Sequence, residues 1–210
     1  HQLRVVEDCA ESLGASYRGH MTGTFSSLST FSFFANKLIT CGEGGMVCTN
    51  EEATADKLRS LRDLYFGKRN KFLHEGLGYN YRISALQAAL GLSQLSRITS
   101  HFTKIREIAA TYSEKLENIK SIQTHTEPPN SVGSFWMYSI LLKDSQLGRD
   151  YVVNNLSKCG IETRPFFVPA HRQPIWPSSG KEESYPASEF VSERGLNLPS
   201  GLTLTDDNIQ

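Results

Sequence analysis

The most informative stretch of the chain runs from residue 28 to residue 49 and reads LSTFSFFANKLITCGEGGMVCT. Its first part, 28–34, alternates Ser and Thr with Leu and Phe, and its last part, 44–49, enters an apolar run through glycines, so both parts predict strands. The short loop between them carries Lys37 and is held by a strand on each side. Such confinement favours removal of the lysine from water and hence its neutral, nucleophilic form. Local features alone also fit an ordinary exposed loop lysine.

A second strand-like run lies upstream of this stretch. Residues 3–6 predict a short buried strand that ends at Glu7 and Asp8 and delivers an acid to a loop. Ligand sites of α/β sheets lie at such strand ends, although a turn or helix cap is the simpler role for Asp8. An acid at one strand end and Lys37 after a neighbouring strand are together the groups that pyridoxal phosphate requires, the acid for the pyridinium nitrogen and the lysine for the Schiff base.

Helical patterns follow the lysine loop. Residues 51–66 place leucines on one face, which predicts a helix, and Asn50 is predicted to cap it. From Ser84 to Leu116 apolar residues recur in steps of three and four, and this spacing predicts one long amphipathic helix or two collinear ones.

The pair Pro128-Pro129 interrupts this pattern and marks a candidate domain boundary. Beyond it the sequence predicts a strand at 135–142, a helix at 150–159 and a strand at 161–167. The chain is therefore predicted to be α/β and to comprise part of a large domain (1–83), a long connecting helix (84–127) and a small C-terminal α/β domain (128–210). Because it starts within a predicted strand and stops at the acid-rich first turn of a helix, we expect a fragment of a longer protein.

Composition limits the kinds of partner. The 210 residues carry 22 Lys and Arg against 22 Asp and Glu, so general electrostatic attraction to nucleic acid or to an anionic membrane is not expected. The longest aliphatic run is far shorter than the roughly 20 residues of a membrane helix. The four cysteines lack disulfide-framework spacing, which favours a reducing cytoplasm, and the six histidines lack zinc-site spacing, so no metal is predicted.

Four segments carry a resemblance to a known family: VVEDCAESLGA (5–15), TFSFFANK (30–37), GEGGMV (42–47) and GYNYR (78–82). In order and spacing they resemble the DegT/DnrJ/EryC1/StrS sugar aminotransferases, and the resemblance covers nearly the whole chain. The segments at 162–167 and 193–200 are most similar to the perosamine synthase branch. The resemblance implies a fold type I, pyridoxal-phosphate-dependent aminotransferase: part of the large domain with its mixed sheet, then the small α/β domain, with a substantial N-terminal part before residue 1.

The resemblance also implies roles for residues that match the family's motifs. Lys37 is the lysine that binds the cofactor covalently, and Asp8 is the partner of the pyridinium nitrogen. Ser32 is a ligand of the cofactor phosphate, and Glu11 lies near the cofactor ring. Asn80 reaches the cofactor phosphate of the neighbouring subunit, which implies a homodimer because each site then needs two chains.

Two further residues are assigned to the substrate. The resemblance places His171 on the substrate side of the small domain, where a solvated loop histidine is the simpler interpretation. Arg69 belongs to the cluster Lys68-Arg69-Asn70-Lys71, whose cations suit the diphosphate of a nucleotide sugar, with a solvated loop as the alternative.

The implied activity is transfer of an amino group from glutamate to C4 of a nucleotide-linked 4-keto-6-deoxyhexose, with ping-pong kinetics, for a surface polysaccharide such as O-antigen. Related sugar dehydratases of the family have histidine in place of the lysine, so Lys37 favours amino transfer. Two alternatives stay open. One is an aminotransferase acting at C3 or on another nucleotide, and the other is a catalytically inactive, truncated remnant that dimerises.

Overall fold

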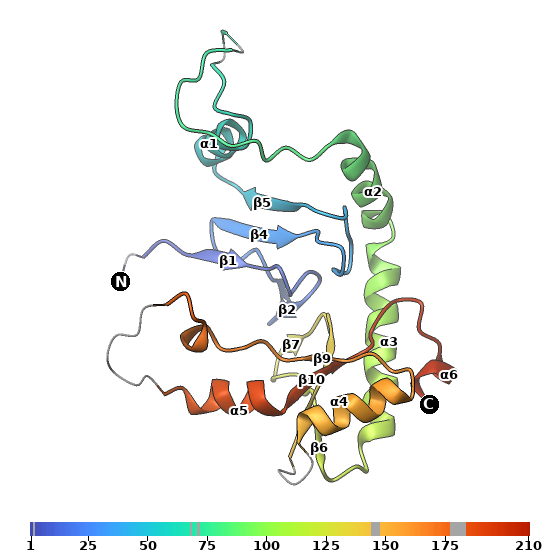
Figure 1. The fold of residues 1–210 in the computed structure, drawn as a ribbon. Helices are drawn as coiled ribbons and strands as arrows, with labels where there is room; N and C mark the ends of the chain where they lie inside the picture. Colours follow the sequence, from blue (N-terminus) through green and yellow to red (C-terminus); the bar gives the residue numbers. More distant parts are fainter. Residues whose placement is uncertain (2, 68, 71, 144–147, 177–183) are drawn as a thin grey trace. The chain divides into compact units, whose positions relative to one another are not determined.

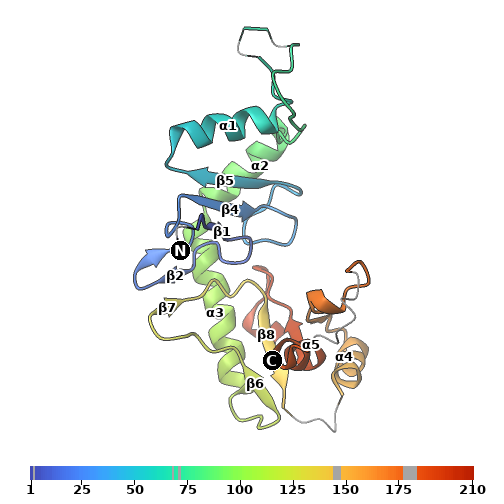
Figure 2. The same ribbon diagram turned by 90° about the vertical axis from the view of Figure 1, so that its left-hand side faces the viewer.

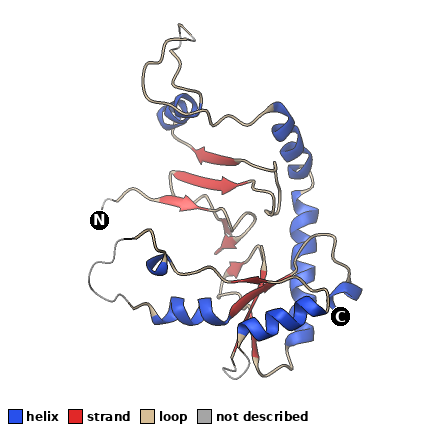
Figure 3. Cartoon of the chain, in the orientation of Figure 1, coloured by secondary structure: helices blue, strands red, loops and turns tan. Residues whose placement is uncertain are grey.

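The computed structural model describes residues 1, 3–67, 69–70, 72–143, 148–176 and 184–210 (Figure 1). The chain forms two compact units: unit 1 comprises His1–Thr103 and Glu127–Trp136, and unit 2 comprises Lys104–Thr126 and Met137–Gln210. Helices and strands occur in both units (Figure 3), which confirms the predicted α/β class. The predicted domain boundaries at 83 and 127 stay a prediction, because these units describe packing within the chain and not the limits of independent domains.

Unit 1 is built on a three-stranded mixed sheet in the order β1-β4-β5. β1 (Val6–Asp8) runs parallel to β4 (Leu28–Ser32), and β5 (Gly45–Thr49) pairs with β4 in the antiparallel sense. The two strands predicted around the lysine loop are thus confirmed. The first strand was predicted three residues too early, because Leu3 is 79% exposed and pairing begins only at Val6.

Helix α1 (Glu52–Arg62) follows β5 and packs against it (Figure 2). The predicted cap at Asn50 was wrong: Glu51 occupies the cap position, and no side chain caps the helix. The helix also ends four residues before the predicted position 66. Leu64 and Tyr65 adopt left-handed backbone, with φ of 57° and 53°, which an α-helix cannot include.

The long amphipathic pattern forms two helices, α2 (Ala85–Leu95) and α3 (Ile98–Leu116), the second of the two predicted alternatives. Ser84 caps α2 in a capping box with Gln87. Between the helices, Ser96 Oγ and Arg97 Nε both donate to the Ser93 carbonyl, at 2.8 and 3.4 Å. Side-chain donors that occupy a backbone carbonyl compete with the helical hydrogen bond and mark the break.

Unit 1 contains a second small sheet that the sequence did not predict. It has the order β3-β2-β7 and consists of β2 (Ser16–Tyr17), β3 (His20–Met21) and β7 (Ser131–Val132). Through β7 the chain returns to unit 1 more than a hundred residues after β2. The residues around β7 are therefore fixed to the same unit as the lysine loop.

Unit 2 contains a four-stranded sheet in the order β6-β8-β10-β9. Its strands are β6 (Ile122–Thr124), β8 (Tyr138–Leu142), β9 (Arg164–Pro165) and β10 (Gly195–Leu198). Its helical segments are α4 (Arg149–Lys158), the 3₁₀ turn η1 (Ala170–Arg172), α5 (Pro186–Arg194) and α6 (Asp206–Ile209). The core includes Tyr138 and Leu196, which are both 0% exposed.

Several predicted elements of this region are confirmed with shifted ends. The helix predicted at 150–159 is α4, and the helix start predicted at the end of the chain is α6, whose Thr205 forms a capping box with Asn208. The strand predicted from 135 begins only at Tyr138, because Phe135 and Met137 have left-handed backbone. The strand predicted at 161–167 is reduced to two residues, and α5 and β10 were not predicted. Within the described ranges no helix has the length and apolarity to cross a bilayer.

Candidate active site

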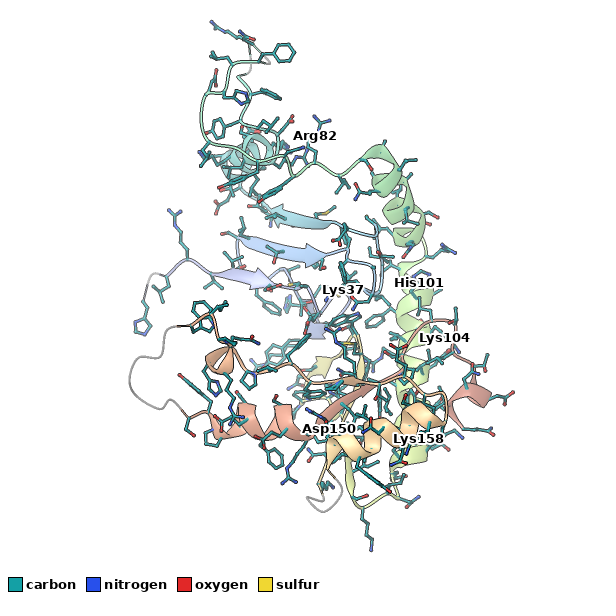
Figure 4. The ribbon with its side chains drawn as sticks, viewed as in Figure 1. Lys37, Arg82, His101, Lys104, Asp150 and Lys158 are labelled. Carbon is teal, nitrogen blue, oxygen red and sulfur yellow. The ribbon has the colours of Figure 1, made fainter. Side chains whose placement is uncertain are left out.

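Lys37 lies on the loop that leaves β4 and returns to β5 (Figure 4). Backbone hydrogen bonds close the base of this loop: the Phe33 N–H donates to the Gly44 carbonyl and the Cys41 N–H to the Phe33 carbonyl, both at 2.9 Å. Thr40 Oγ1 also donates to the Phe33 carbonyl, at 3.1 Å. Lys37 itself is half-buried. The loop is therefore a closed turn that presents the lysine at the end of β4.

Helix α2 supports this loop with two glutamine side chains. Gln94 Oε1 accepts the Thr40 N–H at 3.0 Å, and Gln87 Nε2 donates to the Glu43 carbonyl at 3.0 Å. The two glutamines are seven residues apart, two helical turns, and so lie on one face of α2. Side chains on that face of α2 therefore bind backbone groups of the lysine loop.

Gly91 lies between these glutamines on the same face of α2. A Cβ at this position would lie only 2.6 Å from Cys41 Sγ, and Cys41 is buried. Glycine is therefore required for α2 to approach the loop this closely.

The indole of Trp136 covers the Lys37 amine. Nζ lies 3.4 Å from the ring centroid, and the indole Nε1–H donates to the Asn36 carbonyl at 2.6 Å. The residues on either side, Phe135 and Met137, have φ of 47° and 61°, which is uncommon for residues other than glycine. Trp136 lies in the strand predicted at 135–142 and was not predicted as a site residue, since no local pattern relates it to Asn36, 100 positions earlier.

Glu7, the first of the two acids at the end of β1, binds the backbone of a neighbouring loop. The Glu7 carboxylate accepts the backbone N–H groups of Gly23, Phe25 and Ser26 at 2.6–2.7 Å. Burial opposes ionisation of this carboxyl, but the hydrogen bonds outweigh it and hold the pKa of Glu7 below its ordinary value. Glu7 is therefore part of the structure of the 23–26 loop.

The second acid, Asp8, is exposed and lies on the opposite face of the strand. Its Oδ1 accepts the Ala10 N–H at 3.0 Å and lies 3.4 Å from Thr30 Oγ1. Asp8 pairs directly with Thr30, and Ser32 follows two residues later on the same face of β4. Ser32 Oγ accepts the Phe34 N–H at 3.3 Å, which leaves its hydroxyl hydrogen for an anion.

Glu11 is exposed on the loop after β1, and its backbone carbonyl accepts a hydrogen bond from Ser134 Oγ at 3.1 Å. Ser134 is only 6% exposed and precedes Trp136 by two residues. The segment around β7 thus contacts both the loop that follows Asp8 and the loop that carries Lys37.

Asn80 is exposed on the segment after α1. Its neighbours fix the backbone there: the Tyr79 N–H donates to the Leu61 carbonyl and the Tyr81 N–H to the Arg62 carbonyl, at 2.6 and 2.9 Å. The exposed Asn80 side chain therefore lies on a backbone segment that is hydrogen-bonded to the end of α1. Figure 1 shows this segment beside α1 and away from the lysine loop.

The two residues assigned to the substrate have different surroundings. His171 Nε2 lies 2.9 Å from Glu189 Oε1, its ring packs against Tyr185 with centroids 4.7 Å apart, and its side chain is only 13% exposed. Arg69 is exposed, and its neighbours Lys68 and Lys71 lie outside the described residues. Lys37, Asp8, Ser32 and Glu11 all belong to unit 1, as do Asn80 and Arg69, whereas His171 belongs to unit 2.

The groups at the ends of β1 and β4 fit pyridoxal phosphate by their chemistry. Lys37 would supply an amine for the cofactor's carbonyl carbon, Asp8 a carboxylate for its ring nitrogen, and Ser32 a hydroxyl for its phosphate. Among the described residues, no cluster of three or more His, Cys, Asp or Glu side chains could hold a metal ion.

Comparison with known proteins finds relatives that match nearly the whole of this chain. The chain is 39% identical over 211 residues to the GDP-perosamine synthase of Vibrio cholerae, which covers 100% of this chain and 57% of that protein. It is 32% identical over 204 residues to the dTDP-3-amino-3,4,6-trideoxy-alpha-D-glucose transaminase of Streptomyces venezuelae, covering 96% of this chain and 52% of that protein. The chain therefore spans little more than half the length of these relatives.

A solved structure matches over the whole chain as well. Helicobacter pylori PseC, an aminotransferase involved in the biosynthesis of pseudoaminic acid, superposes with a TM-score of 0.92 at 27% identity, covering 100% of this chain and 57% of that one. This confirms the predicted fold class. The model of the DegT/DnrJ/EryC1/StrS aminotransferase family matches residues 1–210. The chain therefore belongs to the DegT/DnrJ/EryC1/StrS aminotransferase family.

Proposed function

We propose that this chain forms part of a pyridoxal-phosphate-dependent aminotransferase that transfers an amino group from L-glutamate to C4 of a nucleotide-linked 4-keto-6-deoxyhexose. The observation that carries the proposal is the arrangement of Lys37, Asp8 and Ser32 in unit 1. Asp8 and Ser32 share one face of paired strands, and Lys37 lies on the closed loop that β4 enters. Membership of the family supports both the cofactor and the reaction type.

When bound, pyridoxal phosphate supplies an electron sink that stabilises negative charge on the carbon that loses a proton. Asp8 is exposed and hydrogen-bonded on one oxygen by a backbone N–H, so it can hold a proton on the ring nitrogen of the cofactor. The Lys37 amine would hold the cofactor through its carbonyl carbon and, once the amino donor has replaced it there, would be the group that moves a proton from the donor carbon. Ser32 Oγ would donate to the cofactor phosphate.

The remaining assignments belong to the same proposal. Glu11 lies beside the cofactor ring, and Asn80 reaches the cofactor phosphate of a second copy, so that the active species is a homodimer. The exposure of the Asn80 amide on a fixed backbone supports this role. His171 and Arg69 contact the nucleotide sugar, and the reaction takes place in the cytoplasm.

Amination at C4 is favoured by the relatives named GDP-perosamine synthase, at 39% identity. Amination at C3 is the second candidate, because the 32% identical relative of Streptomyces venezuelae is named as a transaminase of a 3-amino sugar. The two products differ in the carbon that carries nitrogen. Nuclear magnetic resonance of the product formed from GDP- and dTDP-linked 4-keto-6-deoxyhexoses therefore separates them.

The decisive experiment is borohydride reduction of the protein, at its natural full length, after incubation with pyridoxal phosphate. Mass spectrometry of the digest should locate the reduced cofactor on Lys37. Lys37→Ala should abolish the label, whereas Lys57→Ala, which removes an exposed lysine of α1, should retain it. In a separate sample that has not been reduced, L-glutamate should yield about one equivalent of 2-oxoglutarate per active site before any sugar is added, as a ping-pong mechanism requires.

A protein that holds no cofactor at Lys37 would refute the enzyme proposal. Cofactor bound at Lys37 with no 2-oxoglutarate would instead favour the inactive remnant. Release of 2-oxoglutarate without amination of any keto sugar offered would confirm the first half-reaction and refute the sugar assignment.

A further inference from the structure

We propose that Trp136 is a positioning residue for Lys37: its indole face holds the lysine ammonium in place whenever the amine is not bound to the cofactor. The proposal rests on the proposed function, in which the Lys37 amine leaves the cofactor during each half-reaction. The contact itself lies within unit 1 and involves only this chain.

The geometry of the contact is that of a strong cation–π pair. Lys37 Nζ lies 3.4 Å from the indole centroid, well inside the roughly 6 Å over which such pairs form, and tryptophan is the best aromatic partner. The hydrogen bond from Nε1 to the Asn36 carbonyl fixes the ring on the residue next to the lysine. The ring is therefore anchored to the same loop whose amine it covers.

The segment that carries Trp136 is fixed to unit 1 at several points before the indole. β7 pairs with β2, and the Arg18 N–H donates to the Asn130 carbonyl at 2.7 Å. Ser134 Oγ then binds the Glu11 carbonyl. The left-handed backbone at Phe135 turns the chain immediately before Trp136, and backbone of this kind persists only where its surroundings hold it. The backbone of unit 1 thus determines where the indole lies.

An aromatic face is chemically suited to this task. In the proposed reaction the free Lys37 amine would take a proton from the donor carbon, become an ammonium, and then deliver that proton to the cofactor. A carboxylate in the place of Trp136 would be a competing base for this proton, and an aliphatic side chain would not attract the charge. The indole face attracts the ammonium and accepts no proton, so the lysine stays in position and remains an acid.

The contact can be tested without cofactor, because Trp136 and Trp176 are the chain's two tryptophans. In a Trp176→Phe background, which removes an indole that is 59% exposed, all indole emission comes from Trp136. An ammonium against the ring quenches emission, so Lys37→Met should brighten it. Lys57→Met serves as the matched control and should leave the emission unchanged.

The positioning role is tested in the glutamate half-reaction of the cofactor-loaded, full-length protein. Trp136→Leu removes the ring face and should slow the single-turnover rate by roughly 2- to 30-fold, the range expected for loss of one cation–π contact. The apparent affinity for glutamate should not change. Trp136→Phe keeps a ring face but loses the Nε1–H, and should recover most of the rate.

Brightening by Lys37→Met, together with a rate loss in Trp136→Leu that Trp136→Phe largely repairs, would support the proposal. Indole emission that is unchanged by Lys37→Met would overturn the contact between Lys37 and Trp136. A Trp136→Leu protein whose only defect is weaker glutamate binding would overturn the positioning role. If the parent protein binds no cofactor, the proposed function fails and the positioning role with it, whereas the emission test still decides the contact separately.

Discussion

Substitution of Gly91 by alanine tests how tightly α2 holds the lysine loop. The added Cβ would lie 2.6 Å from Cys41 Sγ and within 4 Å of no other described heavy atom beyond its own helix. Cys41 is only 6% exposed, so the sulfur has no open space to enter. Overpacking of this kind costs about 1–3 kcal/mol, whereas alanine improves helix propensity by about 1 kcal/mol. We expect a net loss in the free energy of unfolding of about 0–2 kcal/mol.

The destabilisation expected for Gly91→Ala comes from overlap with one atom, Cys41 Sγ. A double-mutant cycle with Cys41 isolates this contribution. Cys41→Ala alone loses buried apolar surface worth about 1 kcal/mol. In the double variant the overlap is gone while the helix propensity gain remains, so the two substitutions should couple favourably by about 1–3 kcal/mol. Urea unfolding of the four proteins, followed by circular dichroism, measures the coupling.

Ala88→Gly on the exposed side of the same helix is the matched control, because it reports the propensity difference of about 1 kcal/mol without any overlap. Effects of Gly91→Ala and Cys41→Ala that add to within about 0.5 kcal/mol would refute the reasoning. Such additivity would mean that α2 does not press on the loop at the sulfur of Cys41.

Three further predictions follow from single residues. Because hydrogen bonds hold the pKa of Glu7 below its ordinary value of 4.5, Glu7→Gln should lower the melting temperature at pH 7, and this difference should shrink as the pH falls below about 4.5; equal losses at pH 7 and pH 3 would contradict it. Leu196→Ala should lower the free energy of unfolding in urea by about 2–5 kcal/mol, since Leu196 is fully buried. Gly78→Ala would drive a Cβ into the backbone nitrogen of Tyr65, so amide exchange at Tyr79 should accelerate in hydrogen-exchange mass spectrometry; unchanged protection would count against a fixed 78–82 segment.

The lysine loop was predictable from sequence because its determinants are local. Strands β4 and β5 flank it within 22 residues, and each carries a readable pattern. The start of α2 was equally local, since Ser84 and Gln87 form a capping box over four residues. Ends of elements were less predictable, because left-handed residues such as Leu64 stop a helix without any glycine or proline to announce it.

Strand β10 shows why other elements escaped prediction. Its sequence, Gly-Leu-Asn-Leu at 195–198, is short and half of it consists of residues that favour turns, yet it lies between β8 and β9 in the sheet. Asn197 is only 8% exposed and is accommodated because its Oδ1 accepts from Ser139 and its Nδ2 donates to the Arg164 carbonyl. Both partners are on other strands, so nothing within the segment itself indicates burial.

In the candidate site, too, some residues are recognisable from local sequence and others depend on contacts with distant segments. Glu7 and Asp8 are adjacent acids that only the family's motif distinguishes in the sequence. In the structure the alternation of the strand directs Glu7 to the 23–26 loop and leaves Asp8 exposed. The groups with reactive chemistry carry short motifs. The side chains that support the lysine loop, Gln94 and Trp136, lie 54 and 100 residues after the backbone groups that they bind, those of Thr40 and Asn36. Since the backbone carbonyl and amide of any residue could serve as their partners, these supports leave no signature at the site they serve. Substitutions at other positions that change the placement of the Lys37 side chain are therefore expected on α2 and in the segment after β7.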